Sequence, residues 1–225
     1  MRNNPGRKTV LLAIVVIAAL FGTQGLMGQT PKTADEFNER GIGYFQDEDY
    51  SNAIADFTQA ITLKPDFSEA FNNRAYSYER TGENDKAAAD FTQAIKLDPN
   101  NPERYYRRAI FYIDAVMYDD AITDFNEVVK LDPKAVWAFY YRGYVYSLKG
   151  DERKAIADFT EALKLDPNAA EFYNSRGLSY FNIQDYKNSA LDFETALKIE
   201  PDNAKFKENL EDARRVEQGG PLLNW

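Results

Sequence analysis

Cysteine and histidine are both absent from this chain of 225 residues. Without cysteine, the chain can form neither disulfides nor thiolate metal sites, and without histidine it lacks the usual general base of a nucleophilic pair. The sequence also contains no phosphate-binding glycine loop. We therefore expect no catalytic residue, no metal site and no cofactor, and we predict that the protein is not an enzyme.

Basic residues are outnumbered by acidic ones, 27 against 36. Residues 1 to 30 contain Arg2, Arg7 and Lys8 and no acid, so the rest of the chain has 24 basic residues against 36 acidic ones and a net charge of −12. Nucleic acid attracts clustered lysine and arginine, so this acidic body argues against a nucleic-acid partner. The chain is 44% apolar, which is enough to bury a sizeable core.

The chain has one long apolar run, the 12 residues from Val10 to Phe21, which follow the three cations. This order is typical of a signal peptide, whereas a membrane-spanning helix needs about 20 apolar residues. For residues 1–28, a cleaved signal peptide and an uncleaved membrane anchor both stay open, and 29–33 form a linker. By the positive-inside rule, the repeats described below lie outside the cytoplasm. We expect an exported protein, periplasmic or secreted if cleaved and inner-membrane anchored if not.

A short segment recurs along the chain: ADFTQAI occurs at 55–61 and again at 89–95, and ADFTEAL follows at 157–163. Self-similarity at a fixed period of roughly 20 to 50 residues indicates stacked repeats. A period of 34 residues gives the units 34–67, 68–101, 102–135, 136–169 and 170–203. In every unit, position 8 is Gly or Ala, position 11 is Tyr, position 24 is Phe and position 32 is Pro.

This pattern resembles the tetratricopeptide repeat (TPR) family, with mild departures such as Val128 at position 27 and Ser189 at position 20. The resemblance implies an all-α fold: a right-handed TPR superhelix, or α-solenoid, of five helix-turn-helix repeats with an inner groove. Helical periodicity agrees, because positions 4, 7, 8 and 11 share one arc of a first helix, and positions 20, 24 and 27 share one stripe of a second. A small residue at position 8 lets the Phe at position 24 approach closely. The polar stretch 204–218 is predicted to be a C-terminal capping helix, followed by a flexible tail, 219–225.

Position 7 is Arg and position 23 is Asp in all five units. An active site needs one distinctive constellation, whereas these charges recur in every unit, so we interpret them as ion pairs between helices. Whether each pair closes within a unit or between neighbouring units stays open. Because position 7 lies on the buried arc of the first helix, Arg108 is predicted to face the helix stack. Its neighbour Arg107, at position 6, is predicted to face the groove.

Positions 2, 5, 6, 9, 12 and 13 lie opposite the buried arc, and the resemblance places them on the concave wall. Asn73 and Arg107 match a carboxylate clamp known in some TPR proteins. Asn38, Ile42 and Glu103 stand where that clamp needs other residues, so the clamp is incomplete. The predicted partner-binding residues are Asn72, Asn73, Tyr76, Tyr106, Arg107, Ile110, Trp137, Tyr140, Tyr141, Tyr144 and Asn174.

Aromatic residues concentrate on the predicted groove of the fourth unit. Two hypotheses stay open for them: an exposed binding site, or an aromatic face packed against a neighbouring helix. Acids outnumber arginines on the groove positions, which favours a neutral or cationic ligand. We therefore predict a non-enzymatic scaffold that binds a protein or peptide segment in the groove, with a role in envelope assembly; the alternative is binding of cell-wall glycan. A membrane partner is expected only through the N-terminal segment, if it is uncleaved.

Overall fold

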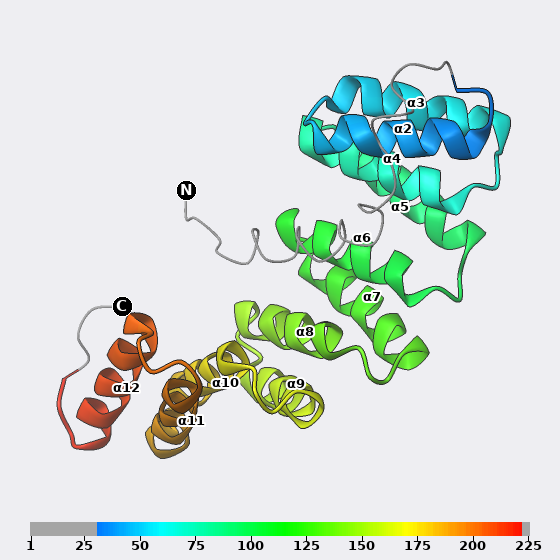
Figure 1. Cartoon of the computed structure of the whole chain (residues 1–225). Helices are drawn as coiled ribbons and strands as arrows, with labels where there is room; N and C mark the ends of the chain where they lie inside the picture. The colour runs from blue at the N-terminus through cyan, green and yellow to red at the C-terminus, as the bar shows by residue number, and fades with distance from the viewer. Residues whose placement is uncertain (1–30, 222–225) are drawn as a thin grey trace. The chain divides into compact units, whose positions relative to one another are not determined.

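The computed structural model describes residues 31–221, and this part of the chain is built from α-helices without any strand. The predicted leader, residues 1–28, lies outside the described residues. No helix within 31–221 is long and apolar enough to cross a membrane. The helices, labelled in Figure 1, are α2 (Ala34–Gln46), α3 (Tyr50–Leu63), α4 (Ser68–Thr81), α5 (Asn84–Leu97), α6 (Pro102–Asp114), α7 (Tyr118–Leu131), α8 (Val136–Leu148), α9 (Glu152–Leu165), α10 (Ala170–Asn182), α11 (Tyr186–Ile199) and α12 (Ala204–Glu217).

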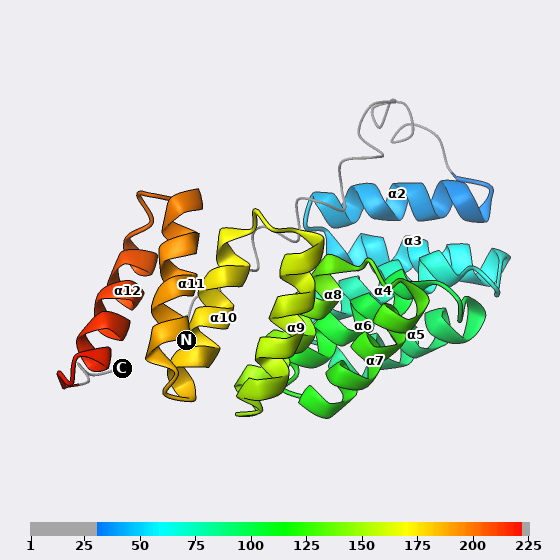
Figure 2. The same cartoon turned by 90° about the horizontal axis from the view of Figure 1, so that it is seen from below.

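The helices fall into two compact units, divided between Leu97 and Asp98. Unit 1 holds α2 to α5, which are the first two predicted repeats, and unit 2 holds α6 to α12. Within each repeat the first helix packs on the second, and within unit 2 each second helix also packs on the first helix of the next repeat. Figure 2 shows this stacking for α10, α11 and α12, which lie side by side. The predicted all-α solenoid of helix-turn-helix repeats is confirmed.

The close approach predicted between positions 8 and 24 is present in the structure. The phenylalanine at position 24 is fully buried in all five repeats. A Cβ atom built on Gly41 would lie 2.7 Å from the Phe57 ring, and one on Gly177 would lie 2.8 Å from the Phe193 ring. Because protein interiors are close-packed, these distances leave no room for a side chain on the glycine. Position 8 is therefore small because a ring occupies the space beside it.

Each turn between the two helices of a repeat contains a residue in the left-handed conformation, always at position 15. Gly82 and Gly150 occupy this position with φ of 79° and 80°. In the other three repeats a residue with a side chain takes the same conformation: Glu48 at 61°, Val116 at 62° and Gln184 at 65°. A β-branched residue is a clear outlier there, because its side chain crowds the backbone. The repeat architecture therefore imposes this turn even where the sequence does not favour it.

Helix α12 closes unit 2 at its C-terminal end. It buries Phe206, Leu210 and Ala213, and it packs on α11. It ends at Glu217, one residue before the predicted end of the capping helix, and Gly219 follows with φ of 83°. The mostly polar remainder of the helix leaves unit 2 with a polar outer face, as a terminal repeat requires. Residues 222–225 of the predicted tail lie outside the described residues.

Candidate functional site

The Arg and Asp columns form ion pairs inside the repeats. Each arginine at position 7 donates from Nε and Nη2 to the two carboxylate oxygens of the aspartate 16 residues later, at 2.6–2.9 Å. The pairs are therefore closed within a repeat, which the sequence left open. They are Arg40–Asp56, Arg74–Asp90, Arg108–Asp124, Arg142–Asp158 and Arg176–Asp192.

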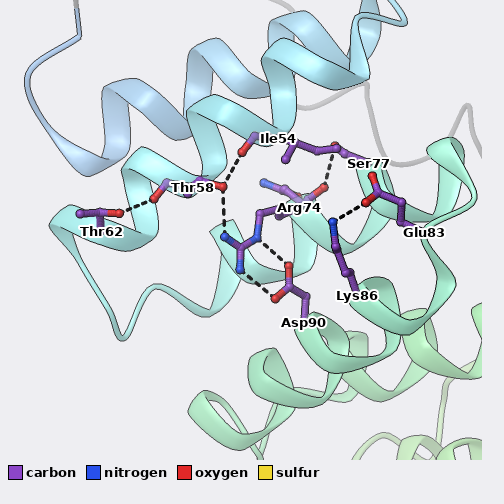
Figure 3. A network of polar contacts seen from close by, with 9 residues as sticks. Ile54, Thr58, Thr62, Arg74, Ser77, Glu83, Lys86 and Asp90 are labelled. Carbon is purple, nitrogen blue, oxygen red and sulfur yellow. Dashed lines mark hydrogen bonds and ion pairs between the residues drawn. The ribbon is translucent and has the colours of Figure 1, made fainter.

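Three of these arginines also bond to the preceding repeat. Arg74 Nη1 donates to Thr58 Oγ1 at 3.1 Å, as Figure 3 shows beside its pair with Asp90. Arg142 and Arg176 make the equivalent bond to position 25 of the repeat before them. One guanidinium thus joins three helices through a fixed fork of donors. This arrangement uses the charges for structure, so the site must be sought elsewhere.

Aromatic side chains from three first helices gather in unit 2. Tyr106 of α6 lies 6.1 Å from Tyr141 of α8, between ring centroids. Trp137 of α8 lies 5.6 Å from Tyr140 and 5.2 Å from Phe172 of α10, edge to face in both cases. Tyr140 in turn stacks on Phe172 at 4.7 Å. We call Tyr106, Trp137, Tyr140, Tyr141 and Phe172 the aromatic cluster.

The members of the aromatic cluster differ in exposure. Trp137 is 49% exposed. Tyr140 is packed under it, its hydroxyl lies 3.4 Å from Ser175 Oγ, and burial raises its pKa well above the ordinary range. Burial also raises the pKa of Tyr141 to about 12. The hypothesis of a packed aromatic face therefore holds for Tyr140, and the hypothesis of an exposed surface holds for Trp137.

Three predicted groove residues are buried, and two of them belong to unit 2. Asn174 is 1% exposed, and its Oδ1 accepts a hydrogen bond from Asn209 Nδ2 at 2.7 Å. The side chain of Arg107 is 10% exposed and is paired with Glu103 on the same helix. We expected both residues to face the groove, and the structure corrects this expectation.

The remaining predicted residues are mostly half-buried. Ile110 packs against the core of the third repeat, and Tyr144 is half-buried on α8. In unit 1, Asn72 is buried, and Asn73 Nδ2 donates to Asn38 Oδ1 at 3.0 Å. The Tyr76 ring lies 5.3 Å from Phe91, edge to face. The structure therefore does not bring the predicted residues of unit 1 into an exposed aromatic surface like that around Trp137.

One packing rule accounts for Tyr140 and Asn174. Position 5 of one repeat meets position 6 of the next, 35 residues later, in the pairs Asn38–Asn73, Tyr140–Ser175 and Asn174–Asn209. In these three pairs the two side chains contact each other and hold neighbouring first helices together. Phe172, at position 3, was missed by sequence reasoning. The sequence contained a signal for it, because the same position is the much smaller Ala70 and Ala138 in two other repeats, so a phenylalanine stands out there.

Family comparison agrees with this architecture. Models described as tetratricopeptide repeat match residues 38–102, 136–169 and 170–203, and a model described as TPR repeat matches 117–150. The chain belongs to the tetratricopeptide repeat family. The TPR fold is generally a non-enzymatic scaffold for protein–protein interaction. A search of curated proteins found no significant match to this chain.

Several solved structures share the fold. MamA is 22% identical, with a TM-score of 0.69 over 77% of this chain and 95% of its own. YrrB, described as a TPR protein with an unusual peptide-binding site, is 16% identical, with a TM-score of 0.68 over 79% and 92%. The pilF protein of Pseudomonas aeruginosa is 18% identical, with a TM-score of 0.69 over 82% and 84%. At these identities the likeness concerns the fold alone.

Proposed function

We propose that this protein is a non-enzymatic scaffold that binds a peptide segment of another protein over the aromatic cluster of unit 2. The observation that carries the proposal is the position of Trp137, which is half exposed while Tyr140 and Phe172 hold its ring. Tryptophan and tyrosine anchors contribute much of the binding energy in protein interfaces. A ring that is already fixed also loses little conformational entropy when a ligand covers it.

The charges beside the aromatic cluster favour a neutral or cationic segment. Glu103, Asp114 and Glu171 stand on the groove positions of α6 and α10, and Arg107 is the one cation on the groove positions of α6, α8 and α10. Because Arg107 is buried and paired with Glu103, its charge is not available to an anionic ligand. Like charges brought together at an interface suppress binding. An acidic peptide is therefore disfavoured.

A peptide array probed with the purified protein tests this proposal. Peptides that bind should be titrated against the unaltered protein, Trp137→Ala and the control Leu191→Ala. Leu191 is 51% exposed, about as much as Trp137, but it lies on a second helix. We expect Trp137→Ala to weaken binding by at least about 10-fold, as for an interface hot spot, and Leu191→Ala to leave it unchanged. Equal effects of the two substitutions would contradict the proposed site.

Glycan binding is the second candidate, because the exposed part of the Trp137 ring also suits the apolar face of a sugar. Trp225→Phe leaves Trp137 as the single tryptophan, since the chain contains two. In that variant, cell-wall oligosaccharides should shift the tryptophan emission to the blue if they bind there. A shift with oligosaccharides but with none of the array peptides would favour the glycan over the peptide.

We also propose that the repeats work outside the cytoplasm, in assembly of the envelope, on the strength of the apolar run behind three cations. The lack of cysteine makes this testable with one introduced thiol. Glu211→Cys places it at an exposed position of α12. A membrane-impermeant maleimide should label this variant in cells with a permeable outer membrane, and the same variant without residues 1–28 is the control. Protection of the full-length variant would contradict export.

A further inference from the structure

Position 2 of the first helices in unit 2 forms a column with an unusual member. Glu103, Trp137 and Glu171 occupy it in successive repeats, near the start of α6, α8 and α10. All three are exposed residues. The tryptophan therefore interrupts a column of acids, because Asp35 and Glu69 hold the same position in unit 1.

The Trp137 ring is fixed but only partly covered. Phe172 and Tyr140 meet it edge to face at 87° and 86°, and Tyr141 lies 6.0 Å away. These three rings hold the indole in place, and 49% of the residue stays exposed. An exposed tryptophan face attracts cations through its quadrupole. The structure thus presents a fixed, half-exposed indole ring, and the charged side chains around this ring decide which ligand group it binds.

Glu171 is the charge that matters most at the Trp137 ring. It is exposed, and the ion pairs found among residues 31–221 do not include it. It directly precedes Phe172 on α10, whose ring lies 5.2 Å from the Trp137 ring, so it stands beside the aromatic cluster. In agreement, its charge adds to the effect of burial in raising the pKa of Tyr140 and of Tyr141. Lys205 occupies the next position of the column, on α12, so the acids of the column end at Glu171.

We infer that Trp137 and Glu171 form a subsite for an arginine side chain of the bound peptide. The inference rests on the proposed function and adds the chemical identity of one ligand group. A guanidinium is planar, stacks on aromatic rings and can donate two parallel hydrogen bonds to one carboxylate. Lysine offers the same charge but neither the plane nor the fork. The subsite therefore prefers arginine to lysine, and either one to a neutral isostere.

Tryptophan fluorescence of the full chain carrying Trp225→Phe tests this inference. The probes are acetyl-Gly-Arg-Gly amide and the same peptide with lysine or with citrulline, which keeps the shape of arginine and removes its charge. We expect saturable binding of the arginine peptide, with a dissociation constant below about 10 mM at low salt, at least about 5-fold weaker binding of the citrulline peptide and lysine in between. Salt should weaken the arginine peptide and leave the citrulline peptide unaffected.

Two charge variants complete the experiment. Glu171→Gln should lower the affinity for the arginine peptide toward that for citrulline, whereas Asp120→Asn, the equivalent change at an exposed acid of α7, should have no effect. Equal binding of the arginine and citrulline peptides overturns the arginine subsite but leaves the proposed function intact. Absence of a saturable change with the arginine peptide up to about 50 mM also overturns it. If, in addition, no array peptide depends on Trp137, the proposed function fails as well.

Discussion

The turn of the third repeat should be strained, and replacing Val116 by glycine should relieve the strain. Val116 has φ of 62°, in a conformation that glycine adopts at the same position in two other repeats. A residue with a side chain pays about 1–2 kcal/mol in this region. Glycine also gives the unfolded chain more freedom, which offsets about 0.4–1 kcal/mol of that gain. Val116 is 66% exposed, so its removal sacrifices little packing.

The net expectation is that Val116→Gly stabilises unit 2 by about 0.5–1 kcal/mol. With a urea dependence of about 2 kcal/mol/M, the unfolding midpoint should rise by roughly 0.3–0.5 M. Val116→Ala is the matched control, because it keeps a Cβ in the left-handed conformation and removes only the branching. It should gain less than glycine does. Circular dichroism during urea unfolding measures all three proteins.

The reciprocal change provides the second half of the test. Gly150 has φ of 80°, and a Cβ atom built there meets no atom within 4 Å. Gly150→Ala should therefore destabilise unit 2 through backbone strain alone. An unchanged or lower midpoint for Val116→Gly would refute the reasoning, and so would an unchanged midpoint for Gly150→Ala.

Other side chains of unit 2 make further predictions. Ser189→Ala should raise the free energy of unfolding by about 1 kcal/mol, because Ser189 Oγ is buried without a hydrogen-bond partner among residues 31–221; a lower urea midpoint would count against this. Arg142→Ala should cost roughly 3–5 kcal/mol by leaving Asp158 buried and unpaired, and the double change with Asp158→Ala should cost less than the sum of the singles in a double-mutant cycle. Tyr140→Ala should lower the free energy of unfolding by about 3–5 kcal/mol, as for a packed aromatic, and an unchanged urea midpoint would show that its ring is not packed. Tyr141 should ionise near pH 12 in the folded protein. Because this pKa is raised above the unfolded value, the stability that the Tyr141 hydroxyl contributes is complete below about pH 10 and is lost as the pH rises toward 12. Tyr141→Phe should therefore remove one late step from the absorbance titration of the tyrosines at 295 nm.

Much of the fold could be predicted from the sequence because each repeat uses the same local physics. The first helices begin at Ala34, Ser68, Pro102, Val136 and Ala170, which are the first residues of the predicted repeats. The alternation of buried and exposed arcs is a property of one helix, so it can be read without knowing its neighbours. The pairing of small position 8 with Phe at position 24 also lies within one helix pair.

The candidate site was predicted less well. The sequence pointed to Trp137 and its neighbouring tyrosines, but it could not separate the exposed tryptophan from the packed Tyr140. It also placed Asn174 and Arg107 on the groove wall, where the structure buries them. These errors share a cause. The periodicity of a single helix shows which face each residue occupies, but it does not show how far the next repeat is shifted along that helix.

The sequence by itself therefore determined the repeat length, the helix pairs and the acidic character of the chain, since these depend on residue spacing and composition. Only the tertiary structure decided that Arg142 bonds Asp158 in its own repeat and Asn126 in the repeat before it. It also decided which aromatic side chain stays exposed, because Phe172 of the following repeat stacks on Tyr140 and meets Trp137 only at an edge-to-face contact. The stacking of one repeat on the next sets the partners of Arg142 and the exposure of the aromatic side chains. The sequence of a single repeat does not encode this stacking.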